Sequence, residues 1–169
     1  VVSSHYPFVN TPAKWGQDGY GRIAQKYAAN RNFHIFCSSQ KDMDTWVSLG
    51  ANPDRVWLSK LGVRPYPYKF DEFASLDRTL CFSQIVDRKR QYLLEDIDTV
   101  DFMGRMEFGG KFARNNPNYK GEVIREKLNE FITCYSNIAL LSEVENTTPL
   151  VIKEGLICGL GVVCSEAVA

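Results

Sequence analysis

Two glutamates lie on either side of a predicted helix start near the end of the sequence. Glu145 lies in a polar loop at residues 142–148, and Glu154 lies about one turn inside the helix that Pro149 introduces. The backbone N–H groups of Leu150 and Val151 have no acceptor within such a helix. Together with the helix dipole they favour an anion, for which a phosphate is the obvious candidate.

Three consecutive cations, Arg88, Lys89 and Arg90, follow a predicted strand at residues 79–83. Loops at the carboxyl edge of a parallel sheet usually bind the ligand. The pattern therefore indicates a second candidate ligand-binding segment.

The segment from Glu145 to residue 163 resembles the donor-sugar motif of GT-B glycosyltransferases, in the large retaining family that uses nucleotide sugars. That motif has an acidic residue, Pro-Leu-Val, a second glutamate and a Gly-Leu-Pro-Val-Val-like run, matched here by Glu145, residues 149–151, Glu154 and residues 159–163. Two departures are visible. The loop is one residue longer, so Asn146 takes the in-register position, and Gly161 stands where proline is usual.

The resemblance implies a role for each matching residue around the helix start. Glu154 would hold the ribose hydroxyls of the nucleotide, and Glu145 would lie near the transferred sugar. Thr148, Leu150 and Val151 would contribute donor contacts from the loop and the first helical turn.

The resemblance also implies a role for the basic segment. Lys89 stands at the place of a lysine that holds the donor diphosphate, whereas Ser83 and Gln84 stand where the family has a Gly-Arg pair. One positive charge is therefore missing, and Arg88 or Arg90 would replace it.

The two histidines carry less information. His5 follows the first predicted strand, on the side where a GT-B cleft opens, and is a catalytic candidate by its position alone. Glu145 is the other catalytic candidate, through the resemblance. His34 alternates within an apolar strand, which is typical of a buried core residue.

Simpler interpretations compete with these roles. A glutamate in the first turns of an exposed helix is common and stabilises the dipole by ~0.3–1 kcal/mol. The cations would then be the solvated start of a helix at residues 88–94.

Composition excludes several classes of protein. The 169 residues are 44% hydrophobic and carry 20 basic and 20 acidic side chains, which argues against a nucleic-acid footprint or an anionic membrane patch. No apolar run approaches the ~20 residues of a membrane span. Five scattered cysteines, without C-x-x-C spacing, predict reduced core thiols and no metal site, as expected in the cytoplasm.

Strands and helices alternate along the chain, which predicts an α/β fold with parallel sheets in two Rossmann-like lobes, both incomplete. Ser39 and Asp42 predict a helix start, Gly50 its end, and residues 122–134 the clearest amphipathic helix. Residues 1–63 are predicted to be the C-terminal part of an acceptor-side lobe, 64–77 a proline-containing connector, and 78–169 a donor-binding lobe truncated at its C-terminus. Both ends suggest a fragment.

The function predicted from this resemblance is retaining transfer of a sugar from a UDP- or GDP-linked donor to an acceptor hydroxyl, with no cofactor or metal. The acceptor would be a glycan, a lipid-linked molecule or a protein. Two alternatives stay open: a nucleotide-sugar epimerase of similar fold, with Glu145 and His5 as its titratable groups, and a non-catalytic nucleotide-binding or scaffold relative.

Overall fold

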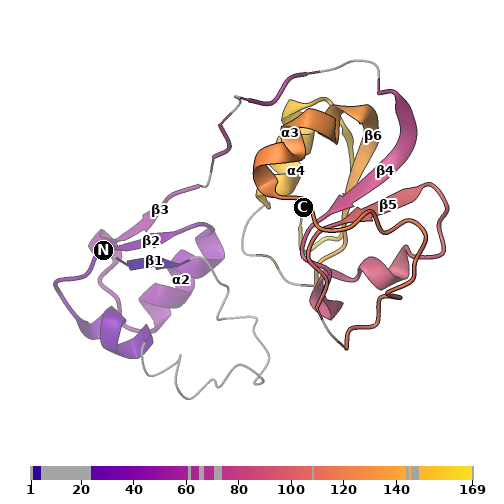
Figure 1. The fold of residues 1–169 in the computed structure, drawn as a ribbon. Helices are drawn as coiled ribbons and strands as arrows, with labels where there is room; N and C mark the ends of the chain where they lie inside the picture. Colours follow the sequence, from indigo (N-terminus) through magenta and orange to yellow (C-terminus); the bar gives the residue numbers. More distant parts are fainter. Residues whose placement is uncertain are drawn as a thin grey trace. The chain divides into compact units, whose positions relative to one another are not determined.

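The computed structural model describes residues 2–4, 24–60, 62–64, 67–70, 74–107, 109–143, 145 and 149–168. The chain divides into two compact units, one of residues 1–61 with 144–147 and one of residues 62–143 with 148–169. Each unit has its own parallel sheet (Figure 1).

The first unit holds a parallel sheet in the order β1 (Val2–Ser4), β2 (Ile35–Cys37) and β3 (Val56–Leu58). A helical segment at residues 24–29, helix α2 (Gln40–Ser48) and the 3-10 turn η2 (Pro53–Arg55) complete the described part of this unit. Its buried core is formed by Ala24, Ala28, Ile35, Cys37, Trp46, Ala51 and Val56.

Helix α2 begins and ends as its sequence predicts. The Ser39 side chain accepts a hydrogen bond from the backbone N–H of Asp42 at 3.2 Å, and Gly50 follows the helix with φ 98°. Within the helix Trp46 is buried, whereas Val47 is 39% exposed. The prediction that His34 is a core residue is wrong, since β2 starts after it and its exposed ring accepts a hydrogen bond from the Trp57 indole at 3.4 Å.

The second unit holds a parallel sheet in the order β5-β4-β6-β7. Its strands are β4 (Leu76–Phe82), β5 (Val100–Met103), β6 (Tyr135–Leu140) and β7 (Gly161–Cys164). Helix α4 (Leu150–Ile157) connects β6 to β7 and ends before Gly159, which has φ 87°. The helix and strand that the sequence predicted around Pro149 and Gly159 are therefore present.

Two predicted helices are broken in the structure. Residues 88–94 form the 3-10 turns η3 (Asp87–Lys89) and η4 (Gln91–Leu93), because Arg90 between them adopts a left-handed φ of 57°. The amphipathic segment at 122–134 forms η5 (Arg125–Lys127), α3 (Leu128–Phe131) and η6 (Ile132–Cys134). Within it Leu128 and Ile132 are fully buried, whereas Ile124, predicted on the same face, is 57% exposed.

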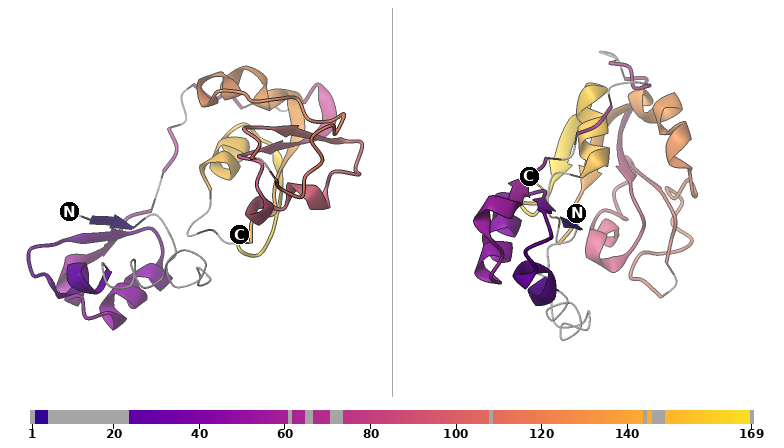
Figure 2. Two further views of the ribbon diagram at one scale, coloured as in Figure 1. Left: turned by 60° about the horizontal axis from the view of Figure 1, so that its bottom comes forward. Right: turned by 90° about the vertical axis from the view of Figure 1, so that its left-hand side faces the viewer.

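Both faces of the second sheet are covered. Leu80 of β4 and Ile138 of β6 point to the face where α3 and α4 lie side by side (Figures 1 and 2). The next residue in each strand, Cys81 and Ala139, points to the opposite face and packs with Phe112 from the loop after β5. This two-sided burial is typical of a parallel sheet.

The five cysteines are thiols, as predicted: Cys37, Cys81 and Cys158 are buried and Cys134 and Cys164 are half-buried. Among the helices in the described ranges, none is long and apolar enough to cross a membrane.

Candidate functional site

The strand order of the second sheet has a topological switch point between β4 and β6. From β4 the chain goes outward to β5, and it then returns to the other side of β4 to form β6. At such a switch point the loops that leave neighbouring strands diverge, and ligands of open α/β sheets bind there, at the carboxyl edge. The loop after β4 contains the basic residues 88–90, and the loop after β6 leads to α4.

These two loops are joined directly. The backbone N–H of Glu143 donates to the carbonyl of Arg88 at 2.8 Å, and Nε of Arg90 lies 3.1 Å from Oε1 of Glu143. The ion pair is half-exposed and is worth about 0.2–1 kcal/mol. The contact engages the charge of Arg90. Lys89 is half-buried and Arg88 is exposed, and their roles as phosphate ligands stay predictions.

The start of α4 has the backbone geometry that the sequence predicted. The carbonyl of Pro149 accepts from the N–H groups of Ile152 at 3.1 Å and Lys153 at 3.3 Å. No side chain caps the helix at Pro149. The N–H groups of Leu150 and Val151 therefore precede the first intrahelical bonds, as required for an anion site.

Glu154 is 2% exposed, and its Oε1 accepts a hydrogen bond from the hydroxyl of Tyr68 at 2.8 Å. The alternative of a solvated helix-start carboxylate is therefore wrong. A carboxylate is buried when specific polar partners hold it. No sequence pattern indicated Tyr68 as a partner, because it lies 86 residues before Glu154.

Of the remaining predicted site residues, the structure describes only Glu145. Glu145 is half-buried in the loop between β6 and α4. His5, Thr148 and Asn146 lie outside the described residues, so their predicted roles stay predictions.

Ser83 and Gln84, in the places of the missing Gly-Arg pair, belong to a polar network. Nε2 of Gln84 donates to Oε1 of Glu107 at 2.6 Å, and Oγ of Ser83 accepts from Nε2 of Gln91 at 2.7 Å. Gly104 is required beside them, since it has φ 137° and a Cβ there would lie 2.1 Å from the carbonyl oxygen of Ser83. The network ties the loop after β4 to the loop after β5.

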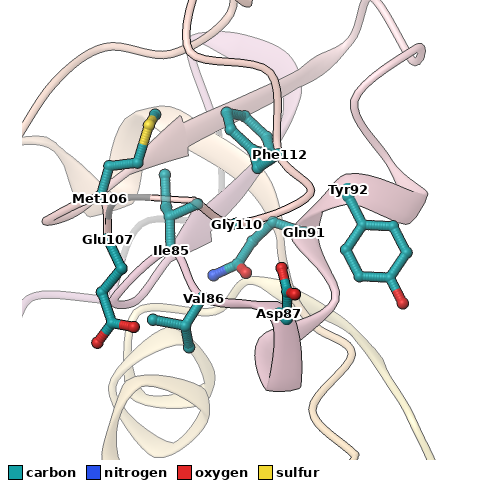
Figure 3. Close-up of a pocket in the computed structure, with 9 residues that line it drawn as sticks. All are labelled: Ile85, Val86, Asp87, Gln91, Tyr92, Met106, Glu107, Gly110 and Phe112. Atoms are coloured by element: carbon teal, nitrogen blue, oxygen red, sulfur yellow. The ribbon is translucent and has the colours of Figure 1, made fainter.

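A small hollow, which we call the β4–β5 hollow, lies between these loops (Figure 3). Gln91 is 3% exposed, and its Oε1 is buried without a hydrogen-bond partner among the described residues. The space is about that of one water molecule, which would satisfy this acceptor. The lining is Ile85, Val86, Asp87, Gln91, Tyr92, Met106, Glu107, Gly110 and Phe112.

The sequence did not predict the hollow. The sequence signals for it are weak: a glycine after a strand and an aromatic residue in a polar loop. The loop is held by a hydrogen bond from the Lys111 N–H to Oδ1 of Asp87 at 2.7 Å and by the Lys111 ammonium, 4.8 Å from the centre of the Tyr92 ring. Over the described ranges, no group of three or more His, Cys, Asp or Glu could hold a metal ion.

No protein-family model and no curated protein matches the chain. Solved structures do. Anabaena Alr3699/HepE in complex with UDP matches with a TM-score of 0.76 at 18% identity, over 98% of this chain and 52% of that chain. Its complex with UDP-glucose matches with a TM-score of 0.72 at 17% identity, over 96% of this chain and 52% of that chain.

The pneumococcal O-GlcNAc transferase GtfA, in complex with UDP and GlcNAc, matches with a TM-score of 0.65 at 14% identity, over 98% of this chain and 37% of that chain. These neighbours are GT-B glycosyltransferases, so the predicted α/β fold of GT-B type is confirmed. The chain spans about half the length of the HepE structures that it resembles.

Proposed function

We propose that this chain carries the donor site of a glycosyltransferase that takes a sugar from a nucleotide-sugar donor and transfers it to an acceptor hydroxyl with retention. The observation that carries the proposal is the contact of Glu143 with Arg88 and Arg90, which joins the basic turn to the loop that leads into α4. The contact supports the proposal because it holds the two candidate phosphate-binding elements at one edge of one sheet.

UDP is the donor nucleotide that we favour over GDP. The HepE neighbours were solved with UDP and UDP-glucose, and GtfA with UDP and GlcNAc. The resemblance of the Glu145–Glu154 segment to the nucleotide-sugar motif supports a nucleotide-sugar donor with either base.

The proposed chemistry assigns a task to each element. Lys89 and Arg88 would stabilise the diphosphate as negative charge develops on it, aided by the N–H groups of Leu150 and Val151. Thr148 would add a contact from the loop, and Glu154 would hold the ribose. Glu145 and His5 would lie near the transferred sugar, which the acceptor attacks on the face that the diphosphate leaves.

The chain's cations and helix dipole would supply the charge stabilisation, so the proposal includes no metal and no cofactor beyond the donor. We place the reaction in the cytoplasm, with a glycan, a lipid-linked molecule or a protein as acceptor.

A second candidate, a non-catalytic relative, is favoured by one observation. Gln84 stands at the arginine position and is engaged with Glu107, so a donor cation is missing there. Such a relative would keep the fold and lose nucleotide binding or turnover.

The first experiment is thermal stabilisation of the purified protein by UDP, GDP, ADP and TDP. A ligand at about a hundred times its dissociation constant adds about 2.7 kcal/mol to the free energy of unfolding. We expect UDP to stabilise most, and Lys89→Ala to reduce the shift by half or more. Lys26→Ala, which removes an exposed lysine of the first unit, is the matched control.

Equal or absent shifts for all four nucleotides, with a cooperative unfolding transition, would contradict a donor site. Turnover separates the remaining classes. Transfer of sugar to water or an acceptor identifies a transferase, conversion of the sugar on the nucleotide identifies an epimerase, and the anomeric configuration of the product reports retention.

A further inference from the structure

The segment that leads from the first unit into the second is attached to α4. The hydroxyl of Tyr68 donates to Oε1 of Glu154 at 2.8 Å. Burial raises the pKa of the Cys158 thiol, and the backbone N–H of the next residue, Lys69, acts to lower it, which places Lys69 beside Cys158. Glu154 and Cys158 are one helical turn apart, so two successive residues of the segment run along one side of the helix. We call residues 67–70 the strap.

The strap belongs to the packed structure. Tyr68 is half-buried and packs against the apolar cluster that includes Val151, Ile152 and Cys158. Its hydroxyl supplies a donor to a carboxylate that is 2% exposed. A hydrogen bond to a charged acceptor in a site that excludes water is among the stronger polar contacts in proteins.

This arrangement conflicts with an open ribose site. A carboxylate that binds ribose accepts hydrogen bonds from sugar hydroxyls, and Tyr68 presents to Glu154 the same chemical group, an O–H donor. Oε2 of Glu154 is also buried. A ribose hydroxyl therefore bonds to Oε1 of Glu154 only after the Tyr68 hydroxyl has left it.

We propose that the strap is an autoinhibitory latch, in which the Tyr68 hydroxyl occupies the place of a ribose hydroxyl on Glu154 and nucleotide binding releases it. The inference rests on the proposed function, because it takes Glu154 as the ribose ligand. The release has a thermodynamic consequence. A protein that must open before it binds has its apparent affinity reduced by the fraction of molecules that are open.

The test compares two ligands on two proteins. The ligands are UDP and 2′,3′-dideoxyuridine diphosphate, which keeps the base and phosphates but lacks the ribose hydroxyls. The proteins are the native chain and Tyr68→Phe, which removes one oxygen. We expect Tyr68→Phe to tighten UDP about tenfold, roughly the worth of one hydrogen bond, and to leave the dideoxy ligand unchanged.

Three results would overturn the latch. Weaker UDP binding by Tyr68→Phe would mean that Tyr68 holds Glu154 in position for the ribose. An equal change in the affinities for both ligands would mean that Tyr68 has a structural role only. An unchanged affinity for both would show that the contact does not oppose binding.

A measurement on the native protein covers the case in which Tyr68→Phe does not fold. Hydrogen exchange at the Lys69 amide, which lies beside the Cys158 thiol in the closed strap, is expected to quicken when UDP is added. Slower or unchanged exchange would contradict release.

Failure of the latch is distinguishable from failure of the proposed function. If native protein binds no UDP, the donor site itself is wrong. The donor site stands if native protein binds UDP better than the dideoxy ligand and Glu154→Gln removes that preference. If Tyr68→Phe then fails to tighten UDP binding, the latch alone is wrong.

Discussion

Arg78 of β4 forms a bidentate ion pair with Asp101 of the neighbouring strand β5. Nη2 of Arg78 lies 2.6 Å from Oδ1 of Asp101, and Nε lies 3.0 Å from Oδ2, so β4 and β5 are joined by a bidentate ion pair. The Tyr135 hydroxyl of β6 donates to Oδ2 at 3.1 Å, and the Lys120 ammonium lies 3.3 Å from Oδ1. One buried carboxylate therefore links the three adjacent strands.

This cluster predicts how stability depends on pH. Burial acts to raise the pKa of Asp101, but the hydrogen bonds from Arg78, Tyr135 and Lys120 outweigh it and hold that pKa below its ordinary value. A lowered pKa stabilises the fold above the unfolded pKa of about 3.9, and the stabilisation is lost as pH falls through the folded value. We expect Asp101→Asn to lower the unfolding free energy at pH 7 by about 1–3 kcal/mol.

Urea unfolding of both proteins at neutral and acid pH measures this contribution. The difference between native protein and Asp101→Asn is expected to shrink below about pH 4. A difference that is constant with pH would mean that the carboxylate charge does not stabilise the sheet.

Gly155 allows α4 to lie close to β6. A Cβ at this position would lie 2.7 Å from Cγ2 of Ile138, so Gly155→Ala is expected to destabilise the protein by about 1–3 kcal/mol. Thermal or urea unfolding gives the value. Gly62→Ala is the matched control, because a Cβ there meets nothing within 4 Å, and its effect is expected within about 0.5 kcal/mol.

A double-mutant cycle identifies the cause. In an Ile138→Ala background the cost of Gly155→Ala is expected to fall, since the colliding Cγ2 is gone. An unchanged cost would point away from contact with Ile138.

The basic turn predicts unequal roles for two neighbouring cations. Lys89→Ala is expected to weaken UDP binding by about 10–100-fold, the equivalent of a lost charge-assisted hydrogen bond. Arg90→Ala is expected to weaken it far less, since Nε of Arg90 is engaged by Glu143 at 3.1 Å. Isothermal titration with UDP distinguishes the two. A larger effect at Arg90 would reassign the phosphate ligand.

The cysteines are expected to differ in reactivity. Burial raises the pKa of the Cys37 thiol, with a further contribution from Asp42, and burial raises the pKa of Cys81, in each case to about 12. The reactive thiolate is then scarce at pH 8. Alkylation followed by peptide mass spectrometry should label half-buried Cys134 and Cys164 first. Early labelling of Cys37 or Cys81 in folded protein would show that these sites open.

Local features were predictable because their causes are local. The cap at Ser39, the helix between Pro149 and Gly159 and the short apolar strands depend on residues within one or two turns of each other. The α/β fold with parallel sheets follows from the alternation of these elements, and the structure and its GT-B neighbours confirm it. The order of the strands, which creates the switch point between β4 and β6, was visible only in the structure.

The sequence by itself determined which segments become strands and which residue types stand near the start of α4, where we predict phosphate binding. Apolar periodicity, proline, glycine and capping side chains act over short spans. Tertiary structure alone decided that Arg90 interrupts a helix and meets Glu143, and that Tyr68 bonds to Glu154. Those contacts join residues 53 and 86 positions apart. Their strength depends on burial and geometry, which exist only once the sheet and its helices are packed.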